Sequence, residues 1–176
     1  MPGTTSLATM HTISAIHDSD WPEVWKLLRE TFAAGDTYSF APDSTEAEIR
    51  KIWIDAPAAT FVVRDADGAL LGTYFIKANQ PGLGDHVCNC GYVVAPRATG
   101  RGIATAMCEH SQAWALGHGF CAMQFNFVVS TNERAVRLWE RLGFQIVGRL
   151  PGAFRHHTLG YVDALVMYKT LYHPAP

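Results

Sequence analysis

Residues 87–110 read VCNCGYVVAPRATGRGIATAMCEH. The first part, residues 87–95, alternates well enough in polarity to predict a β-strand, and Pro96 marks its end. A loop with two glycines follows over residues 97–104. Residues then recur at helical spacing and predict one face of a helix; they are Ile103, Ala106, Met107, His110 and Trp114. This stretch therefore predicts a strand, a glycine loop and a helix in direct succession.

The glycine loop is suited to holding a phosphate group. Gly100 and Gly102 would let bare backbone come close to a phosphate, while the N–H groups of the first helical turn point at it. Arg97 and Arg101 would add positive charge. Taken alone, the loop is equally consistent with an ordinary turn, and it matches neither the GxGxxG pattern nor a P-loop lysine motif.

A second informative segment begins with residues 122–129, whose alternation predicts a strand. Gln124, Asn126 and Val128 would share one face of it. Amides are depleted in strands, so Asn126 either bonds a neighbouring loop or points into a site, and the sequence leaves both open.

Residues 130–133 (Ser-Thr-Asn-Glu) predict a capping box for a helix that ends at Gly143. A strand over 144–148 follows, then a long loop over 151–157 and a last strand over 161–169. We expect the loop to fold over the mouth of a substrate site, with Phe154 and Arg155 as its candidate contacts.

The N-terminal half adds an amphipathic helix from Trp21 to Gly35, with Asp20 and Glu23 placed as its capping box. Four further elements are predicted: a loop over 36–44, a short helix over 45–54, and strands over 60–64 and 69–77 that Asp67-Gly68 joins as a hairpin.

Composition narrows the class of protein. The chain has 176 residues, 48% of them hydrophobic, and a formal charge of -2, which together favour one globular domain over 11–172 and argue against nucleic-acid binding. Residues 1–10 are expected to be disordered. They lack the basic and apolar regions of a signal peptide, and no apolar run is long enough to span a bilayer, so we expect a cytoplasmic protein that binds no membrane.

The cysteines are expected to be small buried apolar residues. They are Cys88, Cys90, Cys108 and Cys121, too few for a disulfide scaffold in a chain of this length. Cys88 and Cys90 lack a second pair at ligand spacing, so no metal site is expected.

Together, the two segments resemble the GNAT superfamily of acetyl-CoA-dependent N-acetyltransferases. The resemblance rests on Arg97, Gly100, Gly102, Ala104, Asn126, Asn132, Ala135 and the run 138–144, LWERLGF. It implies an α/β (α+β) fold with a mixed, mostly antiparallel central sheet flanked by helices. It also implies that the fourth and fifth strands splay apart, so that the pantetheine arm of acetyl-CoA inserts between them as a pseudo-strand.

Acetyl-CoA is thus the co-substrate that the resemblance implies. The main chain of residues 92–94 would pair with pantetheine, residues 97–104 would cradle the pyrophosphate, and Asn132 would meet the pantetheine arm. The positions implied at the cofactor are Tyr92, Val93, Val94, Arg97, Thr99, Gly100, Arg101, Gly102, Ile103, Ala104, Asn132 and Trp139.

Trp139 departs from the superfamily pattern, which often has a tyrosine there as the presumed acid for the leaving thiolate. An indole donates a hydrogen bond but supplies no proton at neutral pH. Trp139 is therefore either a core-facing aromatic or a sign that another group, or water, protonates the thiolate.

A closer similarity is to the yeast enzymes of this superfamily that detoxify azetidine-2-carboxylate and related proline analogues. It rests on residues 75–79, 86–91 and 125–126 and on Trp139. The similarity implies that the position of Asn89 holds the substrate and that of Asn126 acts at the reacting amine or carbonyl. Both are candidate catalytic and substrate-binding residues, and the other candidates for substrate contact are Tyr38, Tyr74 and Phe154.

The expected reaction is direct acetyl transfer in a ternary complex with a small amine or imino acid. Three alternatives stay open: acetylation of another amine such as phosphinothricin or an antibiotic, a non-catalytic acyl-CoA-binding domain, and an interaction protein. A homodimer is compatible with the superfamily resemblance.

Overall fold

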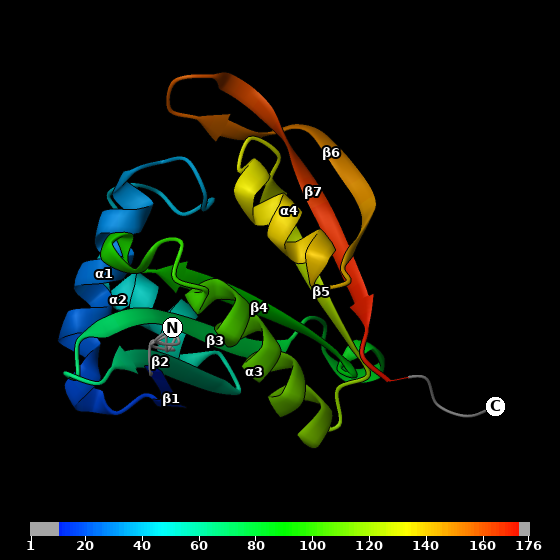
Figure 1. The fold of residues 1–176 in the computed structure, drawn as a ribbon. Helices are drawn as coiled ribbons and strands as arrows, with labels where there is room; N and C mark the ends of the chain where they lie inside the picture. The colour runs from blue at the N-terminus through cyan, green and yellow to red at the C-terminus, as the bar shows by residue number, and fades with distance from the viewer. Residues whose placement is uncertain (1–10, 173–176) are drawn as a thin grey trace, which may run out of the picture.

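The computed structural model describes residues 11–172, and its core is a seven-stranded sheet in the order β1-β2-β3-β4-β5-β7-β6 (Figure 1). The expected disorder of residues 1–10 lies outside the described residues. The strands are β1 His11–Ala15, β2 Ala59–Asp65, β3 Leu70–Ala78, β4 Val87–Val94, β5 Ala122–Val129, β6 Gln145–His156 and β7 Gly160–Thr170.

Four α-helices accompany the sheet in the described part of the chain: α1 Trp21–Ala33, α2 Glu46–Arg50, α3 Ile103–Gly117 and α4 Glu133–Arg141. A π-helical turn, Lys51–Asp55, extends α2, so the predicted helix over 45–54 is confirmed. Three short 3-10 turns complete the elements: Asp18–Asp20, Gly82–Gly84 and Pro96–Ala98. No helix among residues 11–172 is both long enough and apolar enough to span a bilayer.

The helices cover opposite faces of the sheet (Figure 1). On one face, α3 lies across β3 and β4, where the Ser111 hydroxyl is 2.7 Å from the Tyr92 hydroxyl. On the other face, the turn after α2 brings Trp53 edge-on to Phe75, with ring centroids 4.9 Å apart. The predicted mixed and mostly antiparallel sheet flanked by helices is confirmed.

The predicted splay of the fourth and fifth strands is also confirmed. β4 and β5 are parallel and pair only at Val87 with Ala122 and at Cys88 with Met123. Beyond Cys88 the two strands separate, while β5 stays paired with β7, its other neighbour, from Ala122 to Val129. The sheet therefore has an edge inside it, formed by the rest of β4.

Both predicted capping boxes are wrong. The carboxylate of Asp20 does not cap α1; it accepts hydrogen bonds from the His17 N–H and from Arg64, both at 2.8 Å. At α4 the cap is Asn132, whose side chain accepts from the Ala135 N–H at 3.3 Å. At α1, Asp20 is bonded to Arg64 of β2 instead of to the helix. At α4, the Asn132 amide takes the capping position.

The predicted loop over 151–157 is a strand. β6 runs on to His156 and pairs with β7, with a register shift between Leu150 and Phe154. Asp163 holds this irregular stretch by accepting a hydrogen bond from the Gly152 N–H at 2.9 Å. β6 is an edge strand, where a proline such as Pro151 is tolerated because no ladder N–H is required there.

β5 contains a bulge at Asn126, the residue whose side-chain direction the sequence left open. Phe125 pairs with Met167 and Val128 with Leu165, so one extra residue stands on β5 between these pairs. Such a bulge bends a strand and re-aims a side chain, and this one lies at Asn126.

The close approach of β3 and β4 depends on Gly91, which pairs with Phe75. A Cβ placed on Gly91 would lie 2.5 Å from Cε1 of the Phe75 ring. We expect Gly91→Ala to lower the free energy of unfolding by about 1–3 kcal/mol, because the ring must shift in a packed core. Urea unfolding measures this.

Gly117→Ala is the matched control, since nothing lies within 4 Å of a Cβ there. It should be neutral or should stabilise by up to about 1 kcal/mol. Adding Phe75→Leu to Gly91→Ala should recover part of the loss. Equal stability of the Gly91→Ala variant and the wild type would refute the packing argument.

Candidate active site

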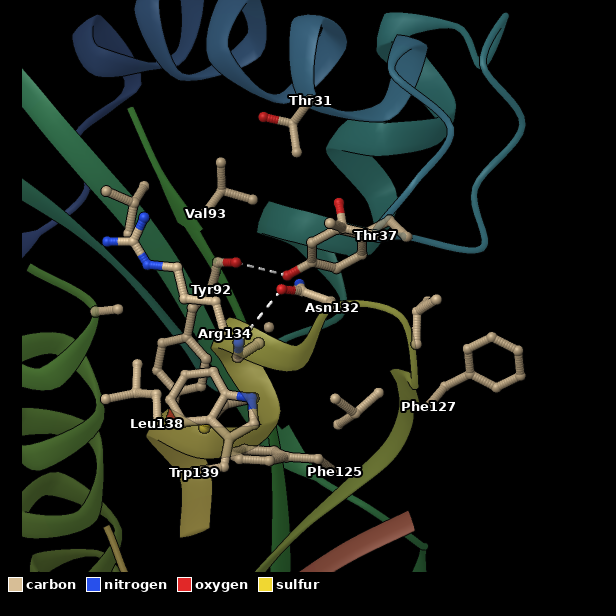
Figure 2. A pocket seen from close by; sticks show the side chains of 18 of the residues that line it. Thr31, Thr37, Tyr92, Val93, Phe125, Phe127, Asn132, Arg134, Leu138 and Trp139 are labelled. Atoms are coloured by element: carbon tan, nitrogen blue, oxygen red, sulfur yellow. Dashed lines mark hydrogen bonds between the residues drawn. The ribbon is translucent and has the colours of Figure 1, made fainter. Parts of the chain in front are cut away.

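A cavity of about 950 Å³ occupies the gap between β4 and β5 (Figure 2). Its walls come from β3, β4, β5, the glycine loop, α4 and the α1–α2 loop. These elements are far apart in the sequence, and the splay of the two strands brings them around one space. The cavity is large enough for a small organic ligand.

The internal edge of β4 presents free main-chain groups to this cavity. Ala95 N–H bonds Leu71 O and Asn79 N–H bonds Val87 O, so the odd-numbered residues of β4 exchange hydrogen bonds with β3. The N–H and C=O groups of the even-numbered residues then face the gap. Past Cys88 these are Cys90, Tyr92 and Val94, and among the described residues no strand pairs with them.

This alternation corrects one prediction. The main chain of Tyr92 and Val94 faces the gap as expected, but that of Val93 is turned to Thr73 on β3. Val93 lines the cavity on its other side, toward the α1–α2 loop. Cys90 is the residue that sequence reasoning missed, because only the pairing register reveals which groups are free.

Tyr38 partly closes the gap. Its hydroxyl donates a hydrogen bond of 2.8 Å to the Tyr92 carbonyl, which Figure 2 marks as a dashed line from Tyr92. The phenol comes from the α1–α2 loop, and burial raises its pKa, so it stays protonated and keeps donating. The prediction that Tyr38 belongs to the site agrees with its position in the cavity wall.

The glycine loop forms one end of the cavity. Gly100 and Gly102 have φ values of 83° and 78°, a left-handed conformation that other residues rarely adopt. Gly102 is the N-cap of α3, and no side chain of the described chain caps that helix. The N–H groups of the first turn are therefore free to meet an anion. The loop residues that line the cavity are Thr99, Gly100, Gly102, Ile103 and Ala104.

Neither of the two arginines predicted for this end lines the cavity, whereas Arg134 does. Arg97 donates a hydrogen bond to Leu70 O at 2.6 Å and borders a separate hollow near α1, and Arg101 does not line the cavity. Arg134 reaches over the cavity from α4, and its Nη2 would be 3.6 Å from a Cβ on Gly100 (Figure 2). No sequence motif points to Arg134. The feature that could have indicated it is its position in the first turn of α4, two residues after the N-cap Asn132.

The two candidate amides, Asn89 and Asn126, line the same cavity. Asn89 Nδ2 donates to Gln124 O at 2.9 Å and so bridges β4 to β5 where their pairing stops. Asn126 Nδ2 donates to Asn79 Oδ1 at 2.6 Å, and its Oδ1 accepts from Gln124 at 2.8 Å. Asn126 thus does both things that the sequence left open: it bonds the loop after β3 and it faces a site.

Trp139 and Asn132 lie on the α4 side of the cavity (Figure 2). The Trp139 ring packs between Tyr92 and Phe125, at centroid distances of 5.2 and 5.0 Å. It is buried, which fits the interpretation of Trp139 as a core-facing aromatic.

Two of the predicted substrate contacts lie away from this cavity. Tyr74 is fully buried under α3, where its hydroxyl bonds His110 Nδ1, and Phe154 is buried in the β6–β7 pair. Neither lines the cavity. Tyr74 was expected at the site because a strand pattern alone does not say which face of the sheet borders the cavity, and Phe154 because residues 151–157 were predicted as a loop, whereas Phe154 is part of β6.

The charged residues in the cavity wall are all cations. Among the described residues that line it, Lys77, Arg134 and Arg141 carry charge, and none is an aspartate, glutamate or histidine. The cavity can bind anions and neutral polar groups, and it offers no carboxylate to a cationic ligand.

Comparisons with known proteins find relatives by sequence. The N-acetyltransferase aca1 of Schizosaccharomyces pombe is 37% identical over 113 residues, which cover 63% of this chain and 54% of that protein. The chain spans about half the length of the curated relatives it matches.

Solved structures show the same fold. A GCN5-related N-acetyltransferase from Kribbella flavida superposes with a TM-score of 0.86 at 41% identity, covering 91% of this chain and 97% of that one. A phosphinothricin acetyltransferase from Sinorhizobium meliloti, solved in complex with acetyl-CoA, gives a TM-score of 0.82 at 19% identity over 94% and 93% of the two chains.

The family model described as "Acetyltransferase (GNAT) family" matches residues 21–144. This region runs from the start of α1 to just past the end of α4 and contains the glycine loop and both candidate amides. The chain therefore belongs to the GNAT acetyltransferase family.

Proposed function

We propose that this protein transfers the acetyl group of acetyl-CoA to the amine of a small molecule. The observation that carries the proposal is the internal sheet edge of Cys90, Tyr92 and Val94, which opens into a cavity with a glycine loop at one end. An extended amide-bearing chain can add to such an edge as a strand, and pantetheine is such a chain.

Cofactor binding at this edge would replace one hydrogen bond by another. Tyr38 already donates to the Tyr92 carbonyl, which an incoming pantetheine amide would need as its acceptor. One hydrogen bond of this kind contributes about 0.5–1.5 kcal/mol, so the α1–α2 loop can release it at small cost. The phosphates would then lie at the start of α3, with Arg134 facing them across Gly100.

The acceptor would enter from the side of the α1–α2 loop, where Asn89 and Asn126 line the cavity. Its neutral amine attacks the thioester carbonyl, the new C–N bond forms and the C–S bond breaks. N–H groups of β4 that face the gap stabilise the developing oxyanion. The amine proton passes to solvent and the thiolate is protonated from it, because no carboxylate or imidazole is among the described residues of the cavity wall.

We assign azetidine-2-carboxylate or a related proline analogue as the acceptor. A small cyclic imino acid presents a carboxylate and a secondary amine, both of which amide side chains can bind. The cavity wall offers two such amides, Asn89 and Asn126, and no anionic side chain among the described residues.

Asn126→Ala tests the assignment of that amide to the chemical step. We expect kcat to fall about 100-fold, as for loss of a group that acts in the transition state, with the acetyl-CoA dissociation constant nearly unchanged. Steady-state kinetics with a free-thiol assay and calorimetry measure the two quantities. Gln124→Ala, which removes only a partner of Asn126, should cost much less. An unchanged kcat in Asn126→Ala would remove Asn126 from the mechanism.

Gly102→Val tests the phosphate end of the cavity. A branched side chain at φ 78° would stand where the phosphates must approach, so acetyl-CoA affinity should fall about tenfold or more. Gly119→Val is the matched control: its φ is 85°, it has open space around a Cβ, and it does not line the cavity. Both variants should lose similar stability, and retained affinity in Gly102→Val would contradict the assignment of the loop.

Arg134→Ala separates the diphosphate from the rest of the donor. We expect the KM for acetyl-CoA to rise about tenfold, since a charge-assisted contact is lost, while the KM for S-acetylpantetheine stays the same. The control is Arg137→Ala on the same helix, because Arg137 is exposed, pairs with Glu133 at 3.1 Å and does not line the cavity. An equal rise for both donors would place Arg134 elsewhere in the mechanism.

A further inference from the structure

Lys77 lies on the acceptor side of the cavity. It is on β3 directly opposite Asn89 on β4, so the two side chains stand on the same face of the sheet, and both line the cavity. This face is the one that the α1–α2 loop covers, since Phe75, two residues earlier on the strand, packs against Trp53, which in turn contacts Tyr38 of that loop. Lys77 is thus next to the candidate substrate amide and on the side from which an acceptor would enter.

The Lys77 ammonium has no anionic partner among residues 11–172. It makes neither an ion pair nor a hydrogen bond there. Its charged end makes a cation–π contact with the Phe75 ring, whose centroid lies 5.6 Å from Nζ. The other lysine in contact with an aromatic ring, Lys169, is by contrast held by Gln112 and by Leu142 O. A half-buried cation with an aromatic face behind it and open space before it is placed to bind an anion.

Arg134 serves a different part of the cavity. It lies beside Gly100 at the glycine loop. Lys77 and Asn89 stand near the point where β4 and β5 still pair, at the opposite end of the β4 edge from the loop. The positive charge near Lys77 is therefore available to the acceptor rather than to the phosphates of the donor.

We infer that Lys77 determines acceptor specificity by binding a carboxylate that the acceptor carries close to its amine. The inference rests on the proposed acetyl transfer and names the charge of its substrate. An α-amino or imino acid meets Lys77 with its carboxylate while its amine points at the thioester between β4 and β5. Polyamines and aminoglycosides bring cationic groups next to Lys77 without a compensating carboxylate, in a cavity whose described wall holds no anionic side chain, and are rejected.

Lys77 also helps the chemistry that the proposed function requires. The carboxylate of an amino acid stabilises the protonated form of its own amine, and an ammonium group that neutralises this carboxylate removes part of that effect. The positive charge of Lys77 also repels the protonated form of the amine directly. The neutral amine, which is the nucleophile, becomes more abundant without any general base in the wall.

The test compares L-azetidine-2-carboxylate with its carboxamide, which has the same ring and amine but no negative charge. In Lys77→Met, the KM for the carboxylate should rise about 10- to 100-fold and that for the carboxamide by no more than about threefold. Lys77→Arg should retain part of the preference for the carboxylate. Lys51→Met is the matched control, since Lys51 is exposed and does not line the cavity, and it should change neither constant.

Three results would overturn the inference while leaving acetyl transfer intact: an equal loss for both acceptors in Lys77→Met, a wild-type preference for the carboxamide, or a preference for spermidine over the carboxylate. Unchanged acetyl-CoA affinity in Lys77→Met separates an acceptor effect from a donor effect. Thermal unfolding of each variant confirms that the fold is kept.

Failure of the proposed function has a different signature, in which no amine is acetylated although acetyl-CoA binds. Calorimetric titration of L-azetidine-2-carboxylate into the CoA-saturated protein then decides the role of Lys77. Binding to the wild type that weakens tenfold or more in Lys77→Met supports the inference, and equal binding to the two proteins, or none, overturns it.

Discussion

The separation of β4 from β5 after two residue pairs is the constraint on which the other features of the molecule depend. Within residues 11–172 it leaves main-chain groups of β4 without a strand partner, a costly state unless a ligand or a side chain satisfies them. The Asn89 side chain bridges the strands at the point of separation, and the bulge at Asn126 bends β5 away. Tyr38 satisfies one of the exposed carbonyls.

The sequence predicted those parts of the fold that depend on local order. The strand, glycine loop and helix over 87–110, the hairpin at Asp67-Gly68 and the helix that ends at Gly143 all have periodicities and turn residues that act over a few positions. The predicted loop over 151–157 failed because Pro151 and Gly152 are also compatible with an irregular edge strand. That strand needs Asp163, eleven residues away, to hold it.

The site was predictable only in part, for a related reason. Asn89 and Asn126 could be proposed from a family resemblance, but the direction of a strand side chain depends on which face a helix covers, and Tyr74 belongs to the α3 face. Lys77 and Arg134 carry no motif of their own. Their roles can be proposed only once the fold shows that both line one cavity, whose described wall has no negative charge.

The unpaired edge of β4 also bears on how the chain avoids self-association. An open strand edge is a template for pairing with strands of other molecules, and proteins usually blunt such edges with charge, proline or a covering element. Here the edge lies in a gap bounded by α4 on one side and by the α1–α2 loop on the other. The walls admit one extended chain and exclude a second sheet, so the same enclosure that makes room for a ligand protects the molecule from edge-to-edge aggregation.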